Sequence, residues 1–200
     1  MLCNEAAFVY CFLSDIRIMK TPNILTLLRI ALIPMLVILF YLPFHWANLA
    51  CGLVFAIACF TDWLDGFVAR KLDQTTKLGA FLDPVADKLI VAVALVLVSV
   101  EYNTAFVTIP AIVIISREIV ISALREWMAE LGKRSNVKVS SLGKIKTAMQ
   151  MLSIFILLVV EHDTYFSLAG IVALYLSALL TIWSMFIYLK AAWSDFKQHS

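Results

Sequence analysis

Long apolar runs alternate with short polar connections along this chain of 200 residues. Six of the runs approach the length that crosses a bilayer as a helix, although two are short or interrupted by charge. They lie at about 24–44, 47–67, 83–100, 104–128, 147–160 and 166–189. Runs rich in Leu, Ala and Met favour helices over barrel strands, which would alternate polar and apolar residues. The pattern therefore predicts an all-α polytopic membrane protein with six transmembrane helices.

Composition supports the membrane assignment. Hydrophobic residues make up 62% of the chain and charged residues 15%, and the mean hydropathy is +0.93, far above what a soluble core needs. The length predicts one domain, which we place at 19–200. Residues 1–18 fit it poorly, because the apolar stretch 6–13 is too short to span and Glu5 stands where a signal peptide would be positive. Two interpretations of this segment stay open, an interfacial helix and an extension ahead of a start at Met19, and we favour the second slightly.

Basic residues mark every second connection between the predicted spans. The connections at 42–48, 101–104 and 161–165 contain no Lys or Arg, whereas the other connections and both tails do. Under the positive-inside rule, this alternation predicts that both termini and the stretch 61–88 face the cytoplasm. The net charge of +2 says little by itself; its one-sided distribution determines the predicted orientation.

The stretch 61–88 concentrates acid in an otherwise apolar chain. Four aspartates form two pairs with spacings of three and four residues: Asp62, Asp65, Asp83 and Asp87. Residues at such spacings share a helix face, so a hairpin of the second and third spans would bring four carboxylates into one polar cavity open to the cytoplasm. Left bare, each aspartate at membrane depth would cost about 3 kcal/mol, and mutual repulsion would add to that.

Divalent cations would balance this charge. Oxygen-only ligands select hard ions, so we predict Mg²⁺ or Mn²⁺, and Mg²⁺ keeps open positions for substrate phosphates. Gly66 and Ala69 leave room beside the carboxylates, and Arg70 can bind a phosphate with two parallel hydrogen bonds. The hydroxyls of Thr75 and Thr76 can donate to a phosphate or a sugar. These residues predict a metal-dependent site for a phosphate or diphosphate at the membrane surface.

The spacing of these residues resembles a known signature without a departure. It is that of the CDP-alcohol phosphatidyltransferase family, and it stands here as Asp62-x2-Asp65-Gly66-x2-Ala69-Arg70-x8-Gly79-x3-Asp83-x3-Asp87. Further similarity lies at 21–34 (TPNILTLLRIALIP), 79–92 (GAFLDPVADKLIVA), 116–135 (SREIVISALREWMAELGKRS) and 143–151 (GKIKTAMQM). Together these segments resemble one bacterial branch of the family, whose acceptor is glycerol 3-phosphate.

That resemblance implies an enzyme of acidic phospholipid synthesis. It would transfer the phosphatidyl group of CDP-diacylglycerol to the 1-hydroxyl of sn-glycerol 3-phosphate and release CMP. The family pattern implies two Mg²⁺ ions, replaceable by Mn²⁺, on Asp62, Asp65, Asp83 and Asp87, with Asp87 also the general base. The implied CDP-diacylglycerol site comprises Thr21, Pro22, Asn23, Ile24, Asp65, Gly66, Arg70, Thr76 and Gly79. A homodimer in the bacterial cytoplasmic membrane is implied too, with membrane lipids and no nucleic acid as partners.

Cations in the fourth and fifth spans are candidates for the acceptor phosphate. Arg117 and Arg125 are eight residues apart on one face of the fourth span. Lys144 and Lys146 open the fifth, and of these two we select Lys144. Arginines within a span are functional candidates by default. The alternative is structural: each arginine precedes a glutamate with which it could pair, and the basic segment 133–146 could attract anionic lipid headgroups.

Several other interpretations stay open. Arg29 either pairs with an aspartate or snorkels, and Lys88 either snorkels or balances charge. The same chemistry could use another acceptor, such as serine, inositol phosphate or a second phosphatidylglycerol. A divalent-cation channel would place its acids near mid-bilayer, away from an arginine that repels cations, and a lipid-binding scaffold would not require the complete signature. We therefore favour the transferase.

Overall fold

The computed structural model describes residues 21–72, 77–130, 141–161 and 164–196. Side chains are described in the same ranges except at 21–25, 63–72, 77–81, 83, 125, 129–130, 141–144 and 187–196.

Six helices make up nearly all of the described chain, as the apolar pattern predicted. They are α2 (Thr21–Tyr41), α3 (Ala47–Leu72), α4 (Lys77–Tyr102), α5 (Ala105–Glu130), α6 (Ser141–Val159) and α7 (Tyr165–Phe196). Several helices extend beyond the predicted spans, because a helix does not end where its apolar run ends. The described residues of the acidic stretch, 61–72 and 77–88, are helical, since α3 continues to Leu72 and α4 begins at Lys77.

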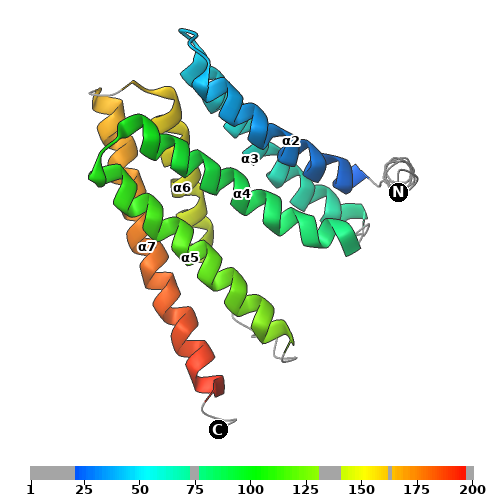
Figure 1. Ribbon diagram of the computed structural model, residues 1–200. Helices are drawn as coiled ribbons and strands as arrows, with labels where there is room; N and C mark the ends of the chain where they lie inside the picture. The colour runs from blue at the N-terminus through cyan, green and yellow to red at the C-terminus, as the bar shows by residue number, and fades with distance from the viewer. Residues whose placement is uncertain (1–20, 73–76, 131–140, 162–163, 197–200) are drawn as a thin grey trace, which may run out of the picture.

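Consecutive helices run in opposite directions (Figure 1). Their contacts divide them into two groups that share one core. In the first group α2 packs against both α3 and α4, which also contact each other. In the second group α7 packs against α5 and α6. Helices α3 and α4 join the groups through contacts with α6, and α4 also contacts α5. The N-terminal ends of α2 and α4 lie beside the C-terminal end of α3, which places the acidic stretch at one end of the first group (Figure 1).

The core consists of apolar side chains that face one another across these contacts. Phe55, Leu95, Ile154 and Leu174 come from four different helices, and each is almost fully buried. Helices α6 and α7 approach closely at Gly170, where a Cβ atom would lie 2.9 Å from Leu157 Cδ2. Tight packing through small residues is typical of helices that associate within membranes.

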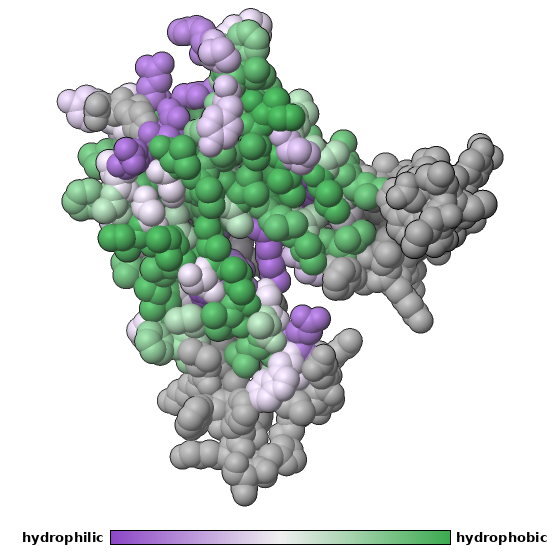
Figure 2. Space-filling view, viewed as in Figure 1, coloured by the Kyte–Doolittle hydropathy of each residue, from purple (hydrophilic) through white to green (hydrophobic). Residues whose placement is uncertain are grey.

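Apolar side chains also cover much of the outside of the helices (Figure 2). Ile38, Leu53, Ile109 and Leu179 are each more than half exposed. A surface this apolar is unusual for a soluble protein and suits contact with lipid. Among the described residues, Ala105–Met128 and Tyr165–Phe186 are long and apolar enough to cross a membrane.

Three shorter apolar helical stretches accompany these two segments, namely Thr26–Tyr41, Ala47–Asp62 and Ile145–Val159. The all-helical fold is thus confirmed. That all six helices cross the bilayer, and that a polar cavity opens to the cytoplasm, stay predictions.

Candidate functional site

A buried arginine joins the two halves of the acidic stretch. Nη1 of Arg29, on α2, donates to Oδ1 of Asp62 on α3 at 3.2 Å. The same nitrogen contacts Oδ1 of Asp87 on α4. Two of the four predicted aspartates, one from each half of the signature, therefore lie against one guanidinium. The choice left open for Arg29 is resolved in favour of pairing.

The helical repeat explains why these three side chains meet. On α2, Thr26, Arg29, Leu32 and Leu36 follow one another at spacings of three and four and are all buried, so they form the inner face of the helix. Arg29 is the one charged member of this set and projects toward the two helices that α2 contacts. Arg29 therefore belongs to the candidate site, because it lies on the packed face of α2 and contacts the carboxylates of Asp62 and Asp87.

Burial differs sharply between the cation and the acids. The side chain of Arg29 is 1% exposed, whereas those of Asp62 and Asp87 are 40% and 36% exposed. Arg29 thus lies behind the carboxylates, on their core side, and the acids retain accessible surface. Carboxylates are the ligands that Mg²⁺ and Mn²⁺ prefer, so the donor type fits the predicted metal, although Oδ1 of Asp87 is itself buried against Arg29.

Other predicted site residues are placed only by their helices. Asp65, Gly66 and Arg70 lie on α3, and Gly79 and Asp83 lie on α4, with side chains outside the described set. The same holds for Thr21, Pro22, Asn23 and Ile24 at the start of α2. Thr76 lies outside the described residues. Among the side chains that are described, no three His, Cys, Asp or Glu residues form a metal-binding group.

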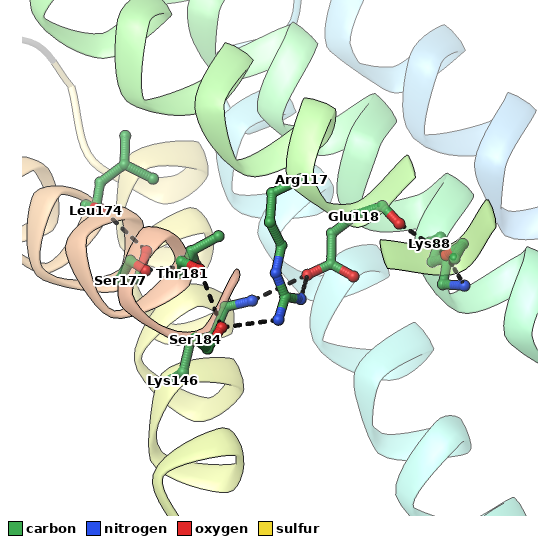
Figure 3. A network of polar contacts seen from close by, with 9 residues as sticks. Lys88, Arg117, Glu118, Lys146, Leu174, Ser177, Thr181 and Ser184 are labelled. Carbon is green, nitrogen blue, oxygen red and sulfur yellow. Dashed lines mark hydrogen bonds and ion pairs between the residues drawn. The ribbon is translucent and has the colours of Figure 1, made fainter. Parts of the chain in front are cut away.

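A second polar network lies among α5, α6 and α7 (Figure 3). Arg117 donates from Nη1 to Oε1 of Glu118 at 2.7 Å and from Nη2 to Oγ of Ser184 at 2.8 Å. Lys146, on α6, donates from Nζ to the same Glu118 oxygen at 3.0 Å. One carboxylate oxygen therefore serves two cations from different helices.

The network is buried, and within it two cations share one carboxylate oxygen. The side chains of Arg117 and Lys146 are 10% and 4% exposed, and that of Glu118 is 28% exposed. In addition, Nε of Arg117 is buried with no hydrogen-bond partner among the described residues. The arrangement is chemically suited to bind an anion that accepts hydrogen bonds.

This network both confirms and changes the sequence expectations. The predicted structural pair of Arg117 with Glu118 is present. Lys146 of α6 contacts Glu118, although the sequence analysis did not select it. The side chains of the selected residues Arg125 and Lys144 lie outside the described set. A periodic signal was available, because Lys146 falls in register with the buried polar residues Gln150 and Ser153.

Lys88 connects the two polar regions. It follows Asp87 on α4, is half-buried, and its Nζ contacts Oγ of Ser122 on α5 (Figure 3). Ser122 in turn donates to the main-chain carbonyl of Glu118 at 2.7 Å. Lys88 therefore points toward α5. Through Ser122 it is connected to the main chain of Glu118, so the residue that follows Asp87 is linked to the second polar network.

Comparisons with known proteins agree with the signature. A sequence model of the family described as CDP-alcohol phosphatidyltransferase matches residues 19–183. The chain is 58% identical over 174 residues to the CDP-diacylglycerol–glycerol-3-phosphate 3-phosphatidyltransferase of Pectobacterium atrosepticum, a match that covers 87% of this chain and 95% of that protein. Enzymes of the same name from Sodalis glossinidius and Yersinia pestis are 56% and 57% identical, over 90% and 88% of this chain and 99% and 97% of their own lengths.

The shared carboxylate of Glu118 gives a stability prediction. Glu118→Gln keeps a hydrogen-bond acceptor but removes the charge that separates the cations of Arg117 and Lys146. We expect the free energy of unfolding to fall by about 3 kcal/mol, as when one partner of a buried ion pair is removed. Thermal unfolding of the purified protein in detergent measures this, with exposed Glu126→Gln on the same helix as the matched control. Equal stability of the two variants would contradict the structural role of Glu118.

Proposed function

Because the chain belongs to the CDP-alcohol phosphatidyltransferase family, we propose that it transfers the phosphatidyl group of CDP-diacylglycerol to sn-glycerol 3-phosphate. The products are phosphatidylglycerophosphate and CMP. The structural observation that carries this proposal is the meeting of Asp62 and Asp87, one from each half of the signature, at Arg29. Relatives that are 56–58% identical to this chain are named for the same reaction, and the aligned region covers 95–99% of their lengths.

Metal binding by the acidic stretch follows from the same arrangement. The family uses a divalent metal, and we assign two Mg²⁺ sites to Asp62, Asp65, Asp83 and Asp87, with Mn²⁺ able to replace Mg²⁺. Bound metal supplies positive charge to the diphosphate of CDP-diacylglycerol. The side chains of Asp62 and Asp87 keep exposed surface on the side away from Arg29, which supports this role.

Donor binding is assigned to the helix ends beside the aspartates. Arg70 can hold a phosphate oxygen pair with its planar guanidinium, and the Thr76 hydroxyl can donate to phosphate or ribose. Gly66 and Gly79 leave room for the nucleotide beside the acids. Thr21, Pro22, Asn23 and Ile24 complete this assignment, since they begin α2, whose N-terminal end lies beside the signature helices (Figure 1).

Asp87 is the proposed general base. Its carboxylate accepts the proton of the acceptor 1-hydroxyl as that oxygen bonds to the phosphorus of the phosphatidyl group. The bond from this phosphorus to the bridging oxygen breaks, and CMP leaves with that oxygen. A glycerol hydroxyl has a pKa far above 7, so a positioned carboxylate helps mainly in the transition state. The contact with Arg29 orients Asp87 for this step.

The acceptor phosphate is assigned to the network around Glu118. Arg117 and Lys146 supply buried cations, and Nε of Arg117 offers a further hydrogen bond. Arg125 and Lys144 remain assigned to the same phosphate by their helical positions. Lys88 and Ser122 link this network to the residue beside Asp87, which is the direction that the acceptor must span from its phosphate to its reacting hydroxyl.

Membrane placement completes the proposal. The protein belongs to a membrane protein family and carries apolar helices. We place all six helices across the bacterial cytoplasmic membrane, with both termini and the active site on the cytoplasmic side, because basic residues occur in every second connection. A homodimer is proposed on family resemblance alone.

An acceptor assay tests the proposed reaction directly. Purified protein receives labelled CDP-diacylglycerol with glycerol 3-phosphate, serine or inositol phosphate in separate reactions containing Mg²⁺. We expect release of CMP and a labelled lipid product with glycerol 3-phosphate. Turnover with serine or inositol phosphate in its place would move the chain to another acceptor class, and no turnover with any alcohol would reject the proposed chemistry.

Asp87→Asn tests the base. Asn keeps the size of the side chain but cannot accept the proton, so we expect kcat to fall at least 100-fold, about the lower bound for general-base catalysis. CDP-diacylglycerol binding, measured on the purified variant, should be largely retained. Glu161→Gln is the control. Glu161 is exposed and follows the C-terminal end of α6, far from the acidic stretch. A near wild-type rate for Asp87→Asn would refute the assignment.

Arg117→Ala tests the acceptor site. The variant loses one buried cation, so we expect the KM for glycerol 3-phosphate to rise about 10-fold or more, in line with a charged hydrogen bond of about 1.5–3 kcal/mol. The KM for CDP-diacylglycerol should change little, and it serves as the internal control. Lys146→Met should act in the same direction. Unchanged acceptor KM in both variants would leave the network a purely structural role.

A further inference from the structure

We propose that Arg29 is a positioning residue that acts as a built-in counter-ion, holding Asp62 and Asp87 together until a divalent cation takes over their charge. This inference rests on the metal assignment made in the proposed function. It adds a residue of α2, outside the signature of α3 and α4, to the machinery of the site.

Burial makes Arg29 dependent on the aspartates. Its side chain is 1% exposed on a helix face otherwise formed by Thr26, Leu32 and Leu36. A guanidinium cannot lose its charge in a protein, and a buried charge without a partner is strongly unfavourable. The ion pairs with the two carboxylates are what allow this residue to occupy the inner face of α2.

The aspartates depend on Arg29 in return. Oδ1 of Asp62 and Oδ1 of Asp87 both contact the same Nη1 atom, so the two acids are necessarily close neighbours. Like charges at such separation repel, and the repulsion grows as the surroundings become less polar. The positive charge between them offsets this repulsion and keeps α3 and α4 in register at the acidic end.

Arg29 and a divalent cation are therefore alternative sources of the same compensation. Arg29 approaches from the core side, and the exposed surface of the acids leaves the other side open to a metal. With Arg29 present, the folded protein tolerates the absence of metal. Without it, the folded state should depend on metal, because a ligand that binds only the folded protein stabilises it by mass action.

Thermal unfolding with and without metal tests this dependence. The purified full chain in detergent is compared as wild type, Arg29→Gln and Arg29→Lys, each in EDTA and in saturating Mg²⁺. We expect Arg29→Gln to unfold at a lower temperature in EDTA and to recover most of the loss in Mg²⁺, so that its Mg²⁺-induced rise in Tm exceeds that of wild type by about 5 °C or more. Arg29→Lys keeps the charge and should resemble wild type.

Leu32→Ala is the matched control, because it weakens the same inner face of α2 without changing charge. Its Tm should fall equally in EDTA and in Mg²⁺. An Arg29→Gln protein that behaves like this control, that cannot be purified even in Mg²⁺, or that matches Arg29→Lys in EDTA overturns the proposal.

Binding of Mn²⁺ to the wild type, followed by electron paramagnetic resonance, separates this proposal from the one on which it rests. Wild type that binds no Mn²⁺ rejects the metal assignment and the role of Arg29 together. Wild type that binds Mn²⁺, combined with an Arg29→Gln variant whose Mg²⁺-induced shift equals that of wild type, rejects the role of Arg29 alone.

Discussion

Mutual repulsion between carboxylates is the constraint on which the rest of this structure depends. An apolar helical bundle brings aspartates of α3 and α4 together, and such a cluster persists only with compensating positive charge. Arg29 supplies one such charge from the core side, and Asp62 and Asp87 keep exposed surface, where we propose that metal binds.

The second polar network differs in composition, because its buried side chains include two cations. Carboxylates on α3 and α4 are the type of group that binds a metal, whereas Arg117 and Lys146 are the type of group that binds a phosphate. Lys88 and Ser122 join the two regions across the contact of α4 with α5 (Figure 3).

Particular residues show what the sequence could and could not predict. The spacing of Asp62 and Asp87 within the signature predicted their meeting, and apolar runs predicted six helices but misplaced the ends where helix continues into polar sequence. Lys144 was selected ahead of Lys146. Two residues turn a helix by about 200°, so the choice depends on which face of α6 is directed toward Glu118. The partner of Arg29 could not be predicted for a similar reason. Periodicity shows that Arg29 lies on the inner face of α2, but it does not show which residues of other helices face it.

Anomalous X-ray scattering from crystals grown with Mn²⁺ would test the central claim most directly. Our account predicts anomalous peaks within about 2.5 Å of carboxylate oxygens of Asp62 and Asp87, at the common end of α3 and α4. Peaks confined to other parts of the protein, or acidic helix ends that lie apart in the metal-bound crystal, would contradict it.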